Sequence, residues 1–461
     1  MFPSSLLGAF AFASIINAFV VNNGTSCYLY PESLTHFGQP VDDSQSIQQA
    51  FELCGVNGTV IFTENVFHVD QVMNTTNLRN VDVHLYGDVF FSTNVPYWLS
   101  HSFNVSLQNQ STAWLFGGTN VSLYGKGGSL NGNGQTWYTE NKGNSNQPGR
   151  PITITIFNST NIYIDSLNIT QPQFWATFVT YSRNVTMTNI YVNATSNDHS
   201  STVNTDGIDT WLACTSLPRL RTTYASPAGT LTPSISRIGL WSTVMIAWLL
   251  KQGNTTNLFV QNVTCYGGNG MTIGSVGQYP DFPDYDQNIT FQGVQLINST
   301  NAAYIKTWQG SSVSTTGNGD AGGGGSGLVK NITFRDLTFS NVVLPLQITQ
   351  CIYTEGTGTD ICETSKMQVE NVLWQNITGT TRYNVGASIH CAASHPCPDI
   401  YFKNVNITSV NQTLGLPLYN TTLQSELFQC ANIINENTTS GIPCNHWAPD
   451  NFPQSISANV R

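Results

Sequence analysis

The chain has 461 residues, and only 9% of them are Asp, Glu, Lys or Arg, against about 25% in an average soluble domain. Hydrophobic residues make up 40% and aromatic residues 11%, so the chain can bury a large core and its low charge does not indicate disorder. The net charge of −10, without any cluster of Lys or Arg, excludes a nucleic-acid partner.

An apolar run from Leu6 to Val21 begins the sequence. It is as long as a signal-peptide core and short for a membrane span, so we expect a cleaved leader at residues 1–21, a secreted protein and no membrane anchor. A buried N-terminal helix is the alternative, because no Lys or Arg precedes the run. Twenty Asn-x-Ser/Thr sequons favour a secreted glycoprotein, although an Asn- and Thr-rich sequence forms some of them by chance.

Ten cysteines in a secreted chain predict disulfide bonds. Several pairs lie close enough in sequence to close short loops, although the sequence does not fix their connectivity. No metal site is expected, because Cys397, flanked by Pro396 and Pro398, favours a disulfide loop over a zinc site. The expected disulfide cysteines are Cys27 and Cys54, Cys351 and Cys362, Cys391 and Cys397, and Cys430 and Cys444.

A helix is expected from Ser44 to Cys54. From about Asn80 onward, short segments recur in which Asn precedes alternating β-branched residues, as in Asn161-Ile162-Tyr163-Ile164. Their spacing, from about 23 residues to the low forties, is typical of solenoids, propellers and repeat arrays. Because a propeller signature is missing, we expect one all-β domain over residues 22–461, a β-solenoid in which each coil packs on its neighbours.

Candidate chemistry begins at Asn204-Thr205-Asp206-Gly207-Ile208-Asp209. We expect the carboxylates of Asp206 and Asp209 to point to one face of a strand. Taken alone, the same residues also suit a simple turn. The later segments Gly268-Asn269-Gly270 and Tyr304-Ile305-Lys306 follow in an order and at a spacing that favour a site.

Together these segments resemble glycoside hydrolase family 28, the polygalacturonases and rhamnogalacturonases, over nearly all of the chain. The run Ser275-Val276-Gly277-Gln278-Tyr279 is similar to the fungal exo-acting branch. The resemblance implies a right-handed parallel β-helix of the pectin-lyase type. It also implies a monomeric, inverting exopolygalacturonase that acts on an acidic plant cell-wall polysaccharide, pectin, without a cofactor.

The resemblance further implies roles for single residues. Asp206 is one of three catalytic carboxylates and helps to activate water. Lys306 binds the carboxylate of galacturonate, which is possible even in an acidic protein because binding depends on the local field. The sugar site is shaped by Asn204, Asp209, Asn269 and Tyr304.

The sequence departs from the family pattern in three places. Asn269 replaces a His and Tyr304 replaces an Arg, and the exo-acting branch tolerates both changes better than the endo-acting one. The third departure is the absence of a Gly-Asp-Asp-Cys motif, because no Asp or Glu occurs between Asp209 and Asp281. An inverting glycosidase needs an acid and a base, and the resemblance assigns the acid to the missing Asp pair.

We therefore regard residues 212–250 as anomalous and hypothesise that they are translated in the wrong frame. When the third base of each codon is joined to the first two of the next, Thr243 to Leu250 permits Gly-Asp-Asp-Cys-Val-Ala-Ile. The Asp pair then falls at Met245 and Ile246, and the restored Cys would pair with Cys265. If the printed residues are real, we expect an irregular excursion there.

Two alternative functions stay open. One is a rhamnogalacturonan exohydrolase on the same fold. The other is a catalytically inactive, pectin-binding protein, which the printed sequence favours because a site without its acid binds substrate and does not turn it over.

Overall fold

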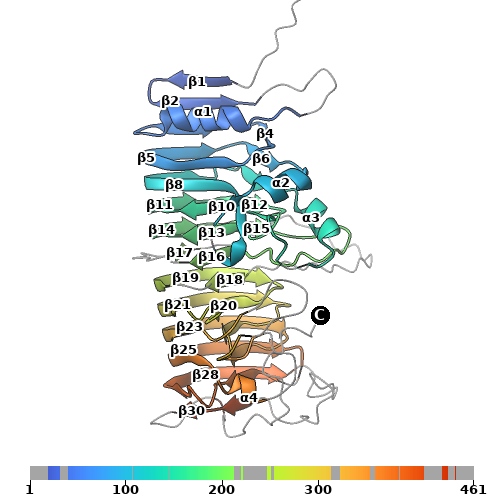
Figure 1. The fold of residues 1–461 in the computed structure, drawn as a ribbon, viewed down its shortest axis with the longest axis vertical. Coiled ribbons are helices and arrows are strands. Elements are labelled where there is room, and N and C mark those ends of the chain that lie inside the picture. Colours follow the sequence, from blue (N-terminus) through green and yellow to red (C-terminus); the bar gives the residue numbers. More distant parts are fainter. Residues whose placement is uncertain are drawn as a thin grey trace, which may run out of the picture.

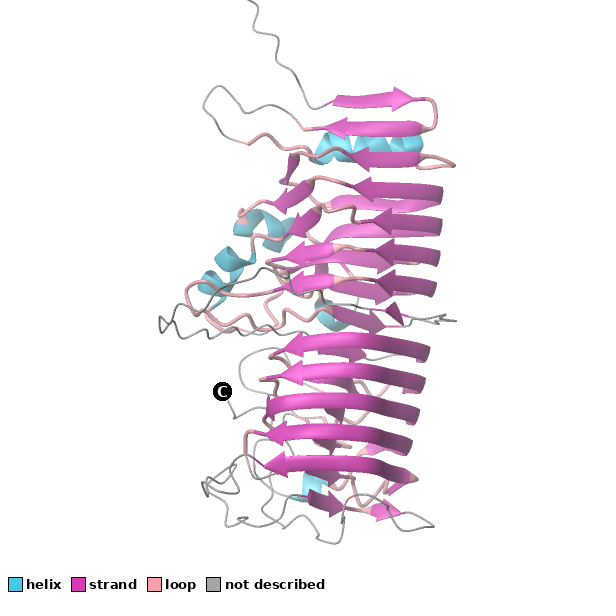
Figure 2. Cartoon of the chain, turned by 180° about the vertical axis from the view of Figure 1, so that it is seen from behind, coloured by secondary structure: helices cyan, strands magenta, loops and turns pink. Residues whose placement is uncertain are grey.

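The structure is a computed structural model that describes residues 19–31, 40–105, 107–144, 146–211, 220–221, 247–250, 254–312, 322–352, 359–383, 385–409, 428–434 and 442. It is an elongated stack of parallel strands (Figures 1 and 2). Consecutive coils pair in register along two long ladders that belong to one 23-stranded sheet of the described residues. The predicted all-β parallel β-helix is confirmed.

The first ladder runs along the whole stack and contains the strands predicted from the Asn-led segments. It consists of β2 (Ser26–Tyr30), β3 (Thr59–Phe62), β5 (Met73–Leu85), β8 (Ser111–Tyr124), β11 (Thr160–Asp165), β14 (Arg183–Thr188), β17 (Leu220–Arg221), β19 (Thr255–Tyr266), β21 (Asp284–Ile297), β23 (Ser326–Val342), β25 (Lys366–Thr381) and β28 (Ile400–Ser409).

The second ladder begins at the amino ends of β5 and β8, and it carries the candidate site. After β8 it consists of β10 (Pro151–Phe157), β13 (Thr177–Thr180), β16 (Ile208–Trp211), β18 (Ala247–Leu250), β20 (Gly270–Val276), β22 (Ala303–Thr307), β24 (Leu346–Thr349), β26 (Ala387–His390) and β29 (Phe428–Ala431).

Shorter pairings complete the strands. A third ladder of five strands contains β4 (Val66–Val69), β6 (Asp88–Phe91), β9 (Ser129–Asn131), β12 (Asn168–Thr170) and β15 (Tyr191–Asn193). The remaining strands are β1 (Phe19–Asn23), β7 (Phe103–Asn104), β27 (Cys397–Pro398) and β30 (Ile433–Ile434). β1 pairs antiparallel with β2, so the last residues of the predicted leader are strand residues in the structure.

The helix expected at residues 44–54 is confirmed as α1 (Ser44–Cys54), and it lies across the N-terminal end of the stack (Figure 1). Its buried face, with Ile47, Ala50 and Phe51, contacts the core. The sequence did not predict α2 (Val95–His101), α3 (Gly134–Asn141), α4 (Thr359–Cys362) or the short 3-10 turn η1 (Leu107–Asn109). No helix in the described ranges is long and apolar enough to cross a membrane.

Asparagine ladders fix the turns of the first ladder. Asn120 donates from Nδ2 to Oδ1 of Asn80 at 2.9 Å, and Asn161 donates to Asn120 at 2.8 Å. All three have a left-handed backbone, with φ from 53° to 60°, which Asn adopts more readily than most residues. Ladder positions also hold several sequon asparagines, so these sequons have a structural cause that is independent of any glycan: Asn57, Asn120, Asn184, Asn288, Asn331 and Asn376.

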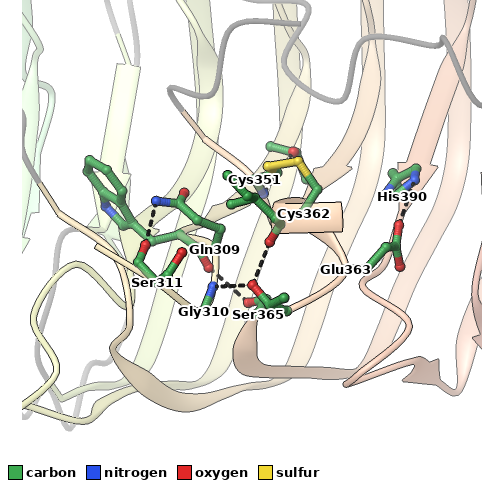
Figure 3. Close-up of a disulfide and its surroundings, with 12 residues drawn as sticks. Gln309, Gly310, Ser311, Cys351, Cys362, Glu363, Ser365 and His390 are labelled. Carbon is green, nitrogen blue, oxygen red and sulfur yellow. Dashed lines mark hydrogen bonds and ion pairs between the residues drawn. A yellow bond between two sulfur atoms is a disulfide. The ribbon is translucent and has the colours of Figure 1, made fainter. Parts of the chain in front are cut away.

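Three expected disulfides are present, Cys27–Cys54, Cys351–Cys362 (Figure 3) and Cys391–Cys397. Cys430 is also disulfide-bonded, and its expected partner Cys444 lies outside the described residues. Cys265 is a buried free thiol, and burial raises its pKa to about 12. The structure therefore confirms three of the four expected pairs.

Candidate active site

The site residues lie on neighbouring strands of the second ladder or directly before them, and Asp206 and Asn269 lie at the amino ends. Ile208 of β16 pairs with Trp248 of β18, which in turn pairs with Met271 of β20. Asp206 and Asn269 each lie two residues before the paired strand position, so they occupy equivalent places two coils apart. β18 runs between them and begins at Ala247, directly after the expected Asp-pair positions Met245 and Ile246, which lie outside the described residues.

The expectation that Asp206 and Asp209 share one strand face is wrong. β16 begins at Ile208, so Asp206 lies before the strand and only Asp209 is part of it. Residues three positions apart would in any case face opposite sides, because side chains alternate along a strand. Both side chains are buried, with 6% of Asp206 and none of Asp209 exposed.

Asp209 belongs to a column of side chains on the outer face of the second ladder. The alternate residues Ile208, Met271 and Ile305 enter the core, so the residues between them point outward. β18 passes between Asp209 and Thr272 in this outer column. In order along the stack, the described side chains of the column are Asn74, Leu115, Thr155, Phe178, Asp209, Thr272, Tyr304, Gln347, Ser388 and Gln429.

Lys306 stands beside this column. It follows Tyr304 by two residues on β22 and therefore shares its face, with Nζ 5.7 Å from the centroid of the Tyr304 ring. Only 6% of Lys306 and 1% of Tyr304 are exposed. The structure thus brings the predicted residues Asp209, Tyr304 and Lys306 to one face.

Asn204 is held by a polar network near the start of β16. Its Nδ2 donates to Oδ1 of Asn146 at 3.1 Å, and the same oxygen accepts a hydrogen bond from Nε2 of Gln110 at 3.2 Å. The backbone of Asn204 is left-handed, with φ 55°. Asn204 therefore has a fixed position next to Asp206, as the resemblance implies for a sugar-site residue.

An apolar cluster covers the outer face on the N-terminal side of Asp209. Phe178 pairs in register with Asp209 and belongs to a hydrophobic cluster that is separate from the core. We call this cluster the end wall. It consists of Val105, Ile152, Phe174, Trp175 and Phe178, all at most 1% exposed.

The loop that carries Val105 reaches further along the stack. Gln108, in η1 between β7 and β8, donates from Nε2 to Oε1 of Gln278 at 2.8 Å. Gln278 follows β20, which is five steps after β8 along the second ladder. The loop therefore crosses the coils of β10, β13, β16 and β18, two of which carry site residues.

Sequence reasoning missed Arg150, which lies directly before β10. Its side chain is 0% exposed, its Nε donates to the carbonyl oxygen of Gln173 at 2.6 Å, and its guanidinium lies 5.2 Å from the ring of Phe174. Burial lowers the pKa of Arg150 to about 10, although Tyr138 and Asp206 act in the opposite direction. A local sequence signal is missing because its contacts come from other coils.

On the other side of Asp209, the outer face is polar. Gln347, Ser388 and Gln429 continue the column, and His390 lies beside it on β26. Figure 3 shows Glu363 reaching toward His390, with Oε1 3.6 Å from Nε2. Burial lowers the pKa of His390, against the raising effect of Glu363.

No group of three or more potential metal ligands occurs among the described residues. The polar groups at the site are carboxylates, amides, hydroxyls and two buried cations, Lys306 and Arg150. The protein is thus a parallel β-solenoid that carries buried polar and charged side chains on the outer face of its second ladder, beside an apolar cluster.

Comparison with known proteins identifies the family. The family described as Glycosyl hydrolases family 28 matches residues 59–214 and 250–425, and the chain therefore belongs to this family of pectin-active glycosidases. An alpha-L-rhamnosidase, rgxB, of Aspergillus niger is 34% identical, over 85% of this chain and 85% of that protein. An exopolygalacturonase of Cochliobolus carbonum is 31% identical, over 87% of this chain and 83% of that protein.

The fold is shared with a protein of known crystal structure. The crystal structure of endo-xylogalacturonan hydrolase from Aspergillus tubingensis has a TM-score of 0.67 and 22% identity, and the match covers 90% of this chain and all of that chain. At this identity the likeness shows the parallel β-helix alone.

Proposed function

We propose that this chain is a secreted, glycosylated exopolygalacturonase, which removes terminal galacturonate from pectin with inversion at the anomeric carbon. The observation that carries the exo mode is the change of chemistry along the outer column. Phe178 and the rest of the end wall adjoin Asp209 on one side, whereas polar side chains, themselves at most 1% exposed, continue on the other. In this proposal a polysaccharide chain lies along the polar side and ends against the end wall, so cleavage occurs near its end.

The charges of the site support galacturonate as the bound sugar. Lys306 is almost fully buried on the outer face, and a buried cation that is paired with an anionic ligand gains more than an exposed one. Asp206 would accept a proton from the attacking water. The acid that protonates the leaving oxygen would come from the restored Asp pair.

Coil spacing sets a condition on this arrangement. Adjacent coils are about 4.8 Å apart, and inverting glycosidases hold their two carboxyl groups about 6.5 to 9.5 Å apart. An acid immediately before β18 would lie one coil from Asp206, so the proposal requires that the two side chains diverge and place their carboxyl groups further apart than their backbones.

The frame hypothesis is part of this proposal, and it is supported by the family match, which leaves out residues 215–249. β17 and β18 carry both ladders through the interval, while residues 212–219 and 222–246 lie outside the described part. Transcript sequencing and peptide mass spectrometry across this interval test it. We expect Gly-Asp-Asp-Cys. Residues as printed would instead leave a pectin-binding protein without turnover.

Product analysis tests the activity. Purified native protein is incubated with polygalacturonate and, separately, with rhamnogalacturonan. We expect monomeric galacturonate as the first product, initially as the β-anomer by NMR because inversion converts the α-linkage. Release of rhamnose alone would favour the activity named for the rgxB relative, and early oligomers of mixed length would overturn the exo mode.

A further inference from the structure

Arg150 is a buried charge whose hydrogen bonds are incomplete. Its Nη1 and Nη2 atoms are buried and have no hydrogen-bond partner among the described residues. The one hydrogen bond from this side chain runs from Nε to the carbonyl of Gln173. Burying N–H groups without hydrogen-bond partners is costly, and the charge of Asp206 offsets only part of the effect of burial on the guanidinium, so a role in packing alone does not account for an arginine here.

The position of Arg150 relates it to the site. The register of β10, β13 and β16 aligns Ile154 with Thr177 and Ile208. Arg150, Gln173 and Asn204 each lie four residues before these aligned positions, in three successive coils. Arg150 is thus two coils, or about 10 Å, from the polar network beside Asp206.

The surroundings of Arg150 strengthen its field. The ring of Phe174, an end-wall residue, lies 5.2 Å from the guanidinium, and the end wall excludes water from the space around it. In such surroundings the effective dielectric constant is low and the field of a charge extends further than in water. Because the pKa of Arg150 remains near 10, the guanidinium keeps its charge at neutral and acidic pH.

We propose that Arg150 is the charge-selecting residue of the closed end, where its buried guanidinium favours a terminal sugar that carries a carboxylate over a neutral one. This inference rests on the proposed function, in which terminal galacturonate lies against the end wall. Arg150 acts through its field and not by contact, since its side chain is fully buried. It would complement Lys306, which lies on the opposite side of the β18 coil.

The test compares two disaccharides of the same stereochemistry and linkage, digalacturonate, with a carboxylate at C6, and α-1,4-linked digalactose, with a neutral hydroxymethyl group at C6. Their Kd values are measured by calorimetry for the wild-type chain and for Arg150→Met and Arg150→Gln. A unit charge at about 10 Å in a protein interior changes anion affinity by about tenfold. We expect both variants to bind digalacturonate about tenfold more weakly and digalactose equally well. Arg183→Met, which removes an exposed arginine of β14, should change neither value.

The pattern of losses separates this role from a structural one. Because the buried Asp206 interacts electrostatically with Arg150, Arg150→Met removes one member of a buried pair and should lower the Tm. A merely structural role would weaken the binding of both sugars alike, whereas charge selection weakens the binding of digalacturonate alone. The inference would be overturned by an equal loss of affinity for both disaccharides, by no loss of affinity for either, or by failure of both variants to fold.

Binding also keeps this test independent of turnover. Wild-type protein that binds neither disaccharide contradicts the proposed function together with the inference. Wild-type protein that prefers digalacturonate, with Arg150→Met unchanged in that preference, contradicts the inference alone.

Discussion

Lys306 is the residue that the proposed function assigns to the substrate carboxylate. It is buried on the outer face beside Tyr304, where an ammonium group attracts a carboxylate strongly because water is excluded. We predict that Lys306→Met raises the Kd for digalacturonate by at least about tenfold. Lys330→Met is the matched control, because Lys330 lies exposed on β23 and forms an ion pair with Glu370 of β25. Equal losses in the two variants would contradict the assignment.

Asp286 is a fully buried acid on β21, aligned with Thr255 and Val329 of the adjoining coils. Burial, followed by the charge of Asp284, raises its pKa well above the ordinary value, while a backbone hydrogen bond from Thr255 opposes the shift. Because the folded-state pKa is raised, the protonated form is the one that folding favours. Its stabilising effect is complete below the ordinary pKa of Asp and is lost as pH rises through the raised value.

Asp286→Asn removes this titration and keeps the shape of the protonated side chain. We predict that the variant and the wild-type protein unfold alike at low pH, and that the variant becomes relatively more stable as pH rises, by up to about 1.4 kcal/mol per pH unit. Urea unfolding at several pH values measures the difference. If the difference in unfolding free energy between the variant and the wild-type protein is the same at every pH, Asp286 is not a buried, protonated acid.

Some site residues could be predicted from the sequence and others could not. Asp206 and Lys306 stand in recognisable local motifs. Arg150 does not, because the residues that its side chain contacts, Gln173 and Phe174, belong to the next coil. The shared face expected for Asp206 and Asp209 was wrong because the strand begins only at Ile208.

At the scale of the element, the asparagine ladders give a direct test of how the coils are held. Asn331 has φ 58°, donates to Asn288 at 2.8 Å and accepts from Asn371 at 2.7 Å. We predict that Asn331→Ala lowers the free energy of unfolding by about 2 kcal/mol, since it loses ladder bonds and strains a left-handed backbone. Asn331→Gly should cost less, because Gly adopts positive φ without strain. Equal costs would assign the whole effect to hydrogen bonding.

These ladders also explain which strands the sequence predicts. First-ladder strands such as β14 show Asn followed by alternating burial, because one face is exposed to solvent. β10, β20 and β22 of the second ladder are buried on both faces over nearly all of their length, so the period-two signal is lost and their strands were not predicted. The loops and side chains that cover the outer face at the site also bury both faces of these strands, so their sequences lack the alternating pattern by which a strand is predicted.

At the scale of the whole molecule, the N-terminal end needs a cap, because an open coil exposes its core and its strand edges. α1 lies over this end, and Cys54 at its last position is joined to Cys27 of β2. We predict that Cys27→Ala with Cys54→Ala destabilises the protein by about 3 kcal/mol, the value for a loop of this size. Thermal unfolding measures it. Cys265→Ala, at a free thiol, should cost clearly less, and an equal loss would mean that the bond has no specific role.

The end wall sets how the proposed enzyme would change its polymeric substrate as a material. Each cut at a chain end removes one sugar and leaves the rest of the polymer at nearly full length, so the entanglement of chains in solution persists. The viscosity of polygalacturonate should therefore fall slowly while free sugar accumulates. The five apolar side chains of the end wall would thus decide whether a pectin solution loses its viscosity quickly or the polymer is shortened slowly from its ends.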